Sequence, residues 1–156
     1  MTAGKGVVHS ERIPDDIRDR QQAVEGIQMW MALPVESEEA EPAFTHYPAA
    51  ELPVDRFEGG ELHLLIGALG ARHSPVDTGT ETLFAVLTLA PGASWRMPAG
   101  AGDRALYLAS GSLAVDSEPL PQHHLMVVDA TRDLLLTSSE GARVVIVGGQ
   151  PYPETR

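Results

Sequence analysis

Short, mostly apolar runs follow one another from residue 52 onward, and turn-forming residues such as Gly and Pro separate them. Short apolar runs bounded by turn signals predict β-strands. No later segment has the 3.6-residue period of a long helix. About eight strands in about 100 residues predict one small all-β barrel or jelly roll. The runs lie at residues 61–69, 82–89, 103–109, 112–115, 125–128, 133–137 and 142–147.

The N-terminal part is less regular and contains one long apolar run at residues 25–34. We expect this run to form a mostly buried strand, with Trp30 in a core. Residues 7–11 follow a glycine-rich lead-in and predict the start of an extended segment. The polar residues 12–22 predict an exposed connection, and the acidic residues 35–42 predict a solvated linker.

Composition narrows the classes of protein to which the chain can belong. Its formal net charge is -11 and its arginines are scattered, so we expect no direct binding to nucleic acid. The chain has no run of about 18 apolar residues, so we expect no membrane span. Because the chain has no Cys, it has no disulfide framework and no thiolate metal site. This composition fits a cytoplasmic protein, which is the location we expect.

One residue separates His9 from Glu11 near the N-terminus. On a strand, side chains two residues apart share a face, so this imidazole and this carboxylate would point into one cavity. The two donor types suit a divalent metal, iron in particular. Two protein ligands rarely hold a metal alone, so the pair predicts one half of a metal site. We interpret the other histidines as structural or surface residues: His46, His63, His73, His123 and His124.

The stretch between Gly92 and Gly111 resembles the metal-binding motif of cupin barrels, G-x5-H-x-H-x3-E-x6-G, in the spacing of its glycines. The three ligand positions hold Pro98, Gly100 and Arg104. Pro and Gly offer no side-chain ligand, and Arg carries a fixed positive charge. The resemblance therefore implies a cupin framework that binds no metal in the usual way. Inside such a barrel Arg104 would need a carboxylate from another strand; the alternative is a position at the barrel mouth.

Two N-terminal segments resemble the pirin family more specifically. Residues 1–12 are similar to the family's second metal-ligand segment, and residues 26–34 are similar to its Gly-hydrophobic-Gln-hydrophobic-Trp strand. Pirins are bicupins with a metal-binding N-terminal barrel and a metal-free C-terminal barrel. The resemblance covers about the last half of a pirin. It implies that residues 1–42 are the remnant of the first barrel, with its strands and an acidic linker, and that residues 43–156 are the second barrel.

The resemblance also implies a ligand set of three His and one Glu, two of the His belonging to a Pro-His-x-His segment. His9 and Glu11 match the other two ligands, and the chain contains no Pro-His-x-His segment. We therefore interpret the sequence as a truncated product, an internal start or an engineered fragment. The expected metal residues are His9 and Glu11, with Fe(II) as the implied cofactor. Half of a ligand set is expected to bind it weakly or not at all.

The function implied by the resemblance is that of an iron-dependent quercetin 2,3-dioxygenase acting on a small aromatic or flavonol substrate. We expect this chain alone to be inactive, because it has half of the ligands. The alternative is a non-enzymatic interaction or regulatory module that acts through a protein partner. The apolar strand expected in residues 25–34 would leave an unpaired edge, which predicts a dimer through the N-terminal strands.

Overall fold

The computed structural model describes residues 1–21, 23 and 26–153. It divides into two compact units, Met1–His46 and Tyr47–Pro153. The boundary placed after residue 42 from the sequence falls shortly before this division. Within the described residues, no helix has both the length and the apolar character that a membrane crossing requires.

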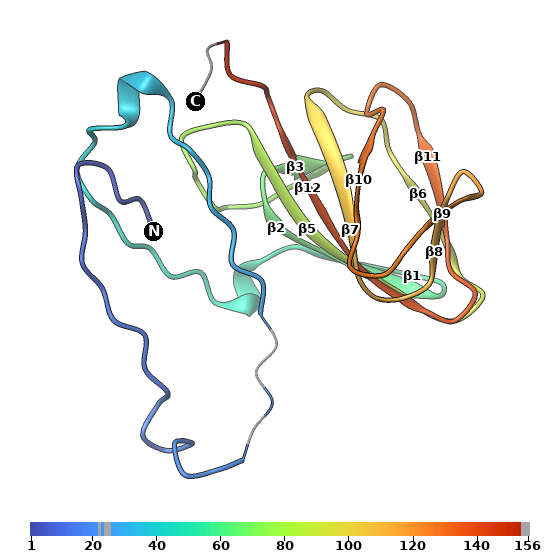
Figure 1. Ribbon diagram of the computed structural model, residues 1–156, viewed down its shortest axis with the longest axis horizontal. Helices are drawn as coiled ribbons and strands as arrows, with labels where there is room; N and C mark the ends of the chain where they lie inside the picture. Colours follow the sequence, from blue (N-terminus) through green and yellow to red (C-terminus); the bar gives the residue numbers. More distant parts are fainter. Residues whose placement is uncertain (22, 24–25, 154–156) are drawn as a thin grey trace. The chain divides into compact units, whose positions relative to one another are not determined.

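The larger unit contains a six-stranded antiparallel sheet with the strand order β1-β2-β5-β12-β7-β10 (Figure 1). Successive side chains of these strands point to opposite faces of the sheet, and one face lies toward the core. β5 shows the pattern clearly, since every second residue from Leu83 to Leu89 is buried. The strands of this sheet are β1 Val54–Phe57, β2 Gly60–Ile66, β5 Thr82–Leu89, β12 Ala142–Gly149, β7 Asp103–Gly111 and β10 Leu125–Val128.

A second sheet of four antiparallel strands has the order β6-β11-β8-β9. Its strands are β6 Ser94–Met97, β11 Leu134–Thr137, β8 Leu113–Val115 and β9 Glu118–Leu120. Two further short strands pair as a hairpin, β3 Ala68–Leu69 and β4 Arg72–His73. A 3-10 turn, η2 Ala49–Glu51, precedes the first strand of the unit.

One hydrophobic cluster fills the space between the two sheets. Leu106 and Leu108 of β7 come from the large sheet, while Met97 of β6 and Leu136 of β11 come from the small one, and all four are at most 1% exposed. Trp95 packs against this cluster from β6, and its ring stacks on that of Phe57 with 6.4 Å between the ring centroids. The shared core makes the two sheets one barrel of the sandwich type.

The prediction of an all-β barrel is confirmed. The runs at 82–89 and 125–128 coincide with β5 and β10, and β7 and β12 extend the predicted runs by two residues each. The run at 61–69 is interrupted at Gly67, where β2 ends before β3 begins. Four strands have no counterpart among the predicted runs: β1, β4, β6 and β9.

The smaller unit is held by contacts between its two ends. Thr2 and Ala43 form an isolated antiparallel bridge, with N–H···O distances of 2.8 and 3.0 Å. The backbone N–H of Lys5 donates to the carbonyl of Ala40 at 3.1 Å, and the Lys5 ammonium pairs with Glu41. The acidic segment contains a short 3-10 turn, η1 Val35–Ser37. The N-terminus is therefore fastened to the acidic segment.

The expected strands of a first barrel are wrong for this chain: the described residues of Met1–His46 form no strand. Residues 26–34 have no strand conformation, and Glu25 of the predicted run lies outside the described residues. Trp30 is 91% exposed and not in a core. The physical reason is that an apolar run becomes a strand only when a neighbour satisfies its backbone hydrogen bonds and covers its apolar face. The single Thr2–Ala43 bridge supplies neither.

Candidate functional site

The three motif positions between Gly92 and Gly111 meet at the end of β6 and the start of β7. Pro98 and Gly100 lie in the connection between these strands, and Arg104 is the second residue of β7. The Nη1 of Arg104 donates a hydrogen bond of 2.6 Å to the carbonyl oxygen of Pro98. Arg104 is 6% exposed, so most of its side chain is buried in the barrel.

Gly100 makes room for the guanidinium. A Cβ at this position would lie 1.8 Å from Nη2 of Arg104, so a larger residue would displace that group. The connection itself is anchored: the Gly100 N–H donates to the Ala130 carbonyl, and the Ala99 N–H donates to an oxygen of Asp133, both at 2.8 Å. Pro98 and Gly100 therefore form a fixed cradle for the Arg104 side chain.

No carboxylate pairs with Arg104 in the part of the chain that the structure describes. The expectation of a carboxylate partner from another strand is therefore wrong. The guanidinium of Arg104 instead donates to the backbone carbonyl of Pro98. Burial lowers the pKa of the Arg104 guanidinium. An arginine nevertheless stays protonated in proteins, so this is a buried, uncompensated positive charge. Such a charge is costly unless a counter-charge or water reaches it.

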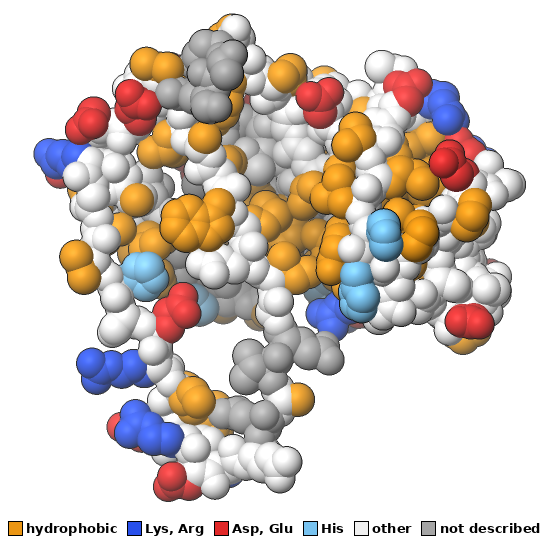
Figure 2. Space-filling view, viewed as in Figure 1, with side chains coloured by type: hydrophobic (Ala, Val, Ile, Leu, Met, Phe, Trp, Pro, Cys, Tyr) orange, Lys and Arg blue, Asp and Glu red, His pale blue; other side chains and the backbone are white. Residues whose placement is uncertain are grey.

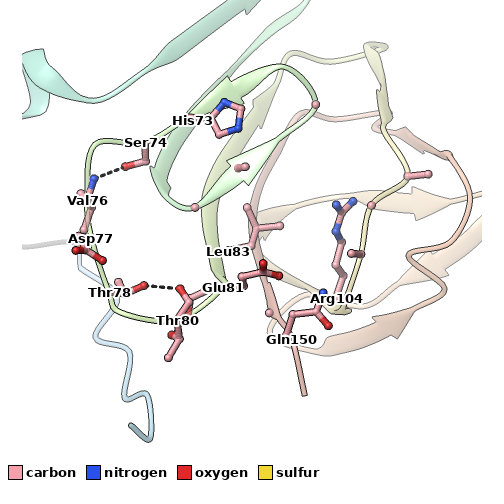
Figure 3. A pocket seen from close by; sticks show the side chains of 18 residues that line it. His73, Ser74, Val76, Asp77, Thr78, Thr80, Glu81, Leu83, Arg104 and Gln150 are labelled. Atoms are coloured by element: carbon pink, nitrogen blue, oxygen red, sulfur yellow. Dashed lines mark hydrogen bonds between the residues drawn. The ribbon is translucent and has the colours of Figure 1, made fainter. Parts of the chain in front are cut away.

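A cavity of about 550 Å³ lies beside Arg104, entirely within the larger unit. Figure 3 shows Arg104 on one side of it and the loop of Ser74–Thr80 on the other, with Leu83 and Glu81 between them. Residues that line the cavity and bear on its chemistry are His73, Asp77, Glu81, Leu83, Arg104 and Gln150.

The loop opposite Arg104 is held by its own hydroxyl groups. The Oγ of Ser74 donates to the carbonyl of Leu65 at 2.7 Å and accepts from the Val76 N–H at 3.2 Å. The Oγ1 of Thr78 donates to the Thr80 carbonyl at 2.9 Å, a contact drawn in Figure 3. These bonds fix the cavity wall, and the cavity is therefore formed before any ligand enters. The sequence did not predict that residues 74–83 line a cavity with Arg104, because they come together only in the folded chain.

His9 and Glu11 lie close to each other in the smaller unit. The Nε2 of His9 is 3.9 Å from the Oε1 of Glu11, and their side chains are 48% and 84% exposed. The expected strand is absent, since residues 7–11 have no strand conformation, yet the two side chains still lie close together. Within the described residues, no group of three or more His, Asp or Glu side chains could hold a metal ion.

The remaining histidines have other partners or surroundings. His63 lies beside Glu61 on β2 with 3.0 Å between Nε2 and Oε1, and this hydrogen bond lowers the pKa of the Glu61 carboxyl. His124 makes a 3.0 Å contact from Nδ1 to the Gln122 carbonyl. His73 lines the cavity. In the described chain none of them forms a metal-binding group with His9.

Comparison with known proteins identifies the barrel. Residues 84–156 match the family model of the pirin C-terminal cupin domain. A pirin-like protein of Caulobacter vibrioides is 34% identical over 152 residues, which are 97% of this chain and 52% of that protein. Residues 84–156 thus form a pirin C-terminal cupin domain, and the chain as a whole is similar to pirin-like proteins. The chain spans about half the length of the curated relatives that it matches.

Other relatives of this pirin-like chain have names that indicate an activity. A Pseudomonas aeruginosa protein, provisionally named a quercetin 2,3-dioxygenase, is 33% identical over 154 residues, or 97% of this chain and 47% of that one. A solved quercetin 2,3-dioxygenase from Acinetobacter baumannii has a TM-score of 0.71 at 27% identity, covering 80% of this chain and 42% of that one. A second structure of that name and organism has a TM-score of 0.73 at 16% identity. The predicted cupin fold is confirmed.

The metal that these names imply can be tested against the donors present. Two donors bound to one ion at about 2.1 Å each are at most about 4.2 Å apart. The 3.9 Å between His9 and Glu11 is below this limit but longer than the about 3.0–3.4 Å between neighbouring ligands of one ion, so the two side chains would have to move closer to share one. The cupin positions of the barrel do not fit a metal, since they hold a proline, a glycine and an arginine.

Proposed function

We propose that this pirin-like chain belongs to a quercetin 2,3-dioxygenase-type system, in which His9 and Glu11 are two of four ligands of one iron ion. The observation that carries the proposal is the His9–Glu11 pair, whose donor atoms lie 3.9 Å apart. The names of the Pseudomonas and Acinetobacter relatives support the choice of reaction and of a flavonol substrate. Iron bound there would supply open coordination positions for oxygen-containing ligands.

The two residues contribute different properties to such a site. His9 offers a neutral nitrogen donor, and Glu11 offers a negative oxygen donor that offsets part of the charge of the ion. Both are accessible, so an ion can reach them without any rearrangement of a core. Because two ligands leave most positions to water, the 156-residue chain alone is expected to hold iron weakly and to be inactive.

Supplying the other two ligands tests the proposal. A first-barrel segment that contains Pro-His-x-His, taken from a pirin-like relative, is joined ahead of this chain. We expect the chimera to bind iron and to consume quercetin and dioxygen, because four ligands then surround one ion. Substitution of His9→Ala in the chimera is expected to reduce turnover at least about a hundredfold. The readout is quercetin absorbance together with oxygen uptake.

The matched control is His46→Ala in the same chimera, since His46 is an exposed histidine of the same unit that the ligand pattern leaves out. Its turnover should equal that of the parent. A folded chimera that binds iron equally well with and without His9 would refute the assignment of the ligand. A folded, iron-loaded chimera without quercetin turnover would refute the assignment of the reaction.

A second candidate function is binding to a protein partner. β10 is an edge strand of the large sheet, and its Leu125 and Val127 are 54% and 75% exposed. Figure 2 shows apolar side chains gathered over the part of the barrel where β10 lies in Figure 1. An exposed edge with apolar side chains is a common place for another chain to add.

This candidate predicts that Val127→Lys removes binding to any partner that the intact chain captures. Leu135→Lys is the control, because Leu135 is 37% exposed but lies on β11 in the other sheet. Capture is measured by pull-down with each purified chain at equal concentration. Equal capture by the three chains would rule out the β10 edge as the binding surface.

A further inference from the structure

Arg104 combines three properties that rarely coincide. It is 6% exposed, it has no carboxylate partner among the described residues, and it lines a cavity. Each side-chain nitrogen of the buried described residues either makes a hydrogen bond or is reached by solvent. Since Nη1 is bonded to Pro98, the other guanidinium nitrogens are reached from solvent, and the cavity is the space beside them. A positive charge with free donors therefore faces a cavity that solvent can enter.

We propose that this cavity binds a small organic monocarboxylate, with the Arg104 guanidinium as its anchoring group. The planar guanidinium presents parallel N–H donors that match the two oxygens of a carboxylate. A bound carboxylate would supply the counter-charge that the barrel itself does not provide. The guanidinium then takes the place of a metal as the cation at the motif positions of this cupin.

The cradle around Arg104 favours binding because it orients the guanidinium in advance. Pro98 accepts one hydrogen bond from Nη1, and the missing side chain at Gly100 leaves the space that Nη2 occupies. Their backbone is fixed in turn through Ala130 and Asp133. A ligand therefore pays little to order the long arginine side chain.

Other groups in the cavity decide which anion it takes. Asp77 and Glu81 also line it, and Figure 3 shows Asp77 on the side of the cavity away from the Arg104 guanidinium and Glu81 between the two. Their negative charges disfavour dianions, and they can accept hydrogen bonds from polar substituents at the far end of a ligand. Leu83 adds an apolar wall, and a volume of about 550 Å³ admits a six-membered ring. These features favour an aromatic or short-chain acid with one carboxylate.

The test is titration of the full 156-residue protein with benzoate, followed by calorimetry and by amide chemical shifts at constant ionic strength. We expect saturable binding of one benzoate per chain, with shifts at residues around Arg104, and binding of sulfate at least about tenfold weaker. Arg104→Met should weaken benzoate binding at least about tenfold. Arg96→Met is the matched control, because Arg96 is an exposed arginine of β6 outside the cavity.

Two further variants keep the test decisive if Arg104→Met does not fold. Gly100→Ala should weaken benzoate binding, since its Cβ displaces Nη2. Glu81→Gln should strengthen it several-fold by removing a like charge from the cavity. The proposal is overturned if benzoate does not saturate the wild-type protein, or if a folded Arg104 variant binds it unchanged. Equal affinity for sulfate and benzoate would overturn the assignment to monocarboxylates.

Discussion

Replacing Gly111 by alanine is expected to remove most of the stability of the barrel. Gly111 ends β7 beside Gly141 and Ala142, with a φ of +87°. A Cβ there would lie 2.0 Å from the carbonyl oxygen of Gly141, a backbone atom that cannot turn away. The substitution must therefore separate β7 from β12, two neighbouring strands of the large sheet. We expect a loss of several kcal/mol, a large share of the ~5–15 kcal/mol that stabilises an ordinary domain.

Gly92→Ala is the matched control for this prediction. Gly92 also has a positive φ, +77°, but nothing lies within 4 Å of a Cβ built on it. It should cost only the ~1–2 kcal/mol of a left-handed backbone conformation. Both values come from urea unfolding followed by circular dichroism. If the two variants lose the same stability, the close approach of β7 to Gly141 is not what requires a glycine.

Leu106→Ala is expected to lower the free energy of unfolding by about 2–5 kcal/mol, because it leaves a cavity at the centre of the core. Leu106 is 0% exposed and belongs to the cluster between the two sheets. It also lies two residues from Arg104 on β7, so softening the core there should loosen the wall of the cavity. The measurement is again urea unfolding, with benzoate titration as a second readout.

Leu125→Ala is the control for the core prediction, since it makes the same chemical change at a side chain that is 54% exposed. It lies on β10, directly beside β7, and should change the stability by less than about 0.5 kcal/mol. Equal losses for the two leucines would mean that the core does not lie where the structure places Leu106.

Apolar runs between turn signals are sufficient to predict many of the strands and insufficient for the others. β5 and β10 stand at their predicted bounds because each is an almost unbroken apolar run. β9 has a proline at its centre and β1 has two charged residues among four, so neither has a clear strand signal. These strands form because a neighbour offers hydrogen bonds, which is a property of the fold rather than of the segment.

Residues 26–34 show the opposite error. Their apolar run predicts a buried strand around Trp30, but the structure has no strand there and Trp30 is 91% exposed. A strand needs a neighbouring strand that pairs with its backbone along its length, and an apolar run does not by itself supply one.

The candidate sites differ in how much of them the sequence revealed. The spacing from Gly92 to Gly111 singled out Pro98, Gly100 and Arg104 as the former ligand positions, and the structure brings these three together. What spacing could not reveal is that a carbonyl and a missing side chain, rather than a carboxylate, accommodate the guanidinium. Glu81 and Leu83 complete the cavity from a distant part of the chain.

The most direct test of the account measures iron bound to the 156-residue protein. The protein is incubated with Fe(II) without oxygen, passed through a desalting column, and assayed for metal and protein. Because the motif positions of the barrel hold Pro98, Gly100 and Arg104, and no group of three or more His, Asp or Glu side chains among the described residues could hold a metal ion, we predict far less than one iron per chain after the column. One tightly held iron per chain would contradict the account.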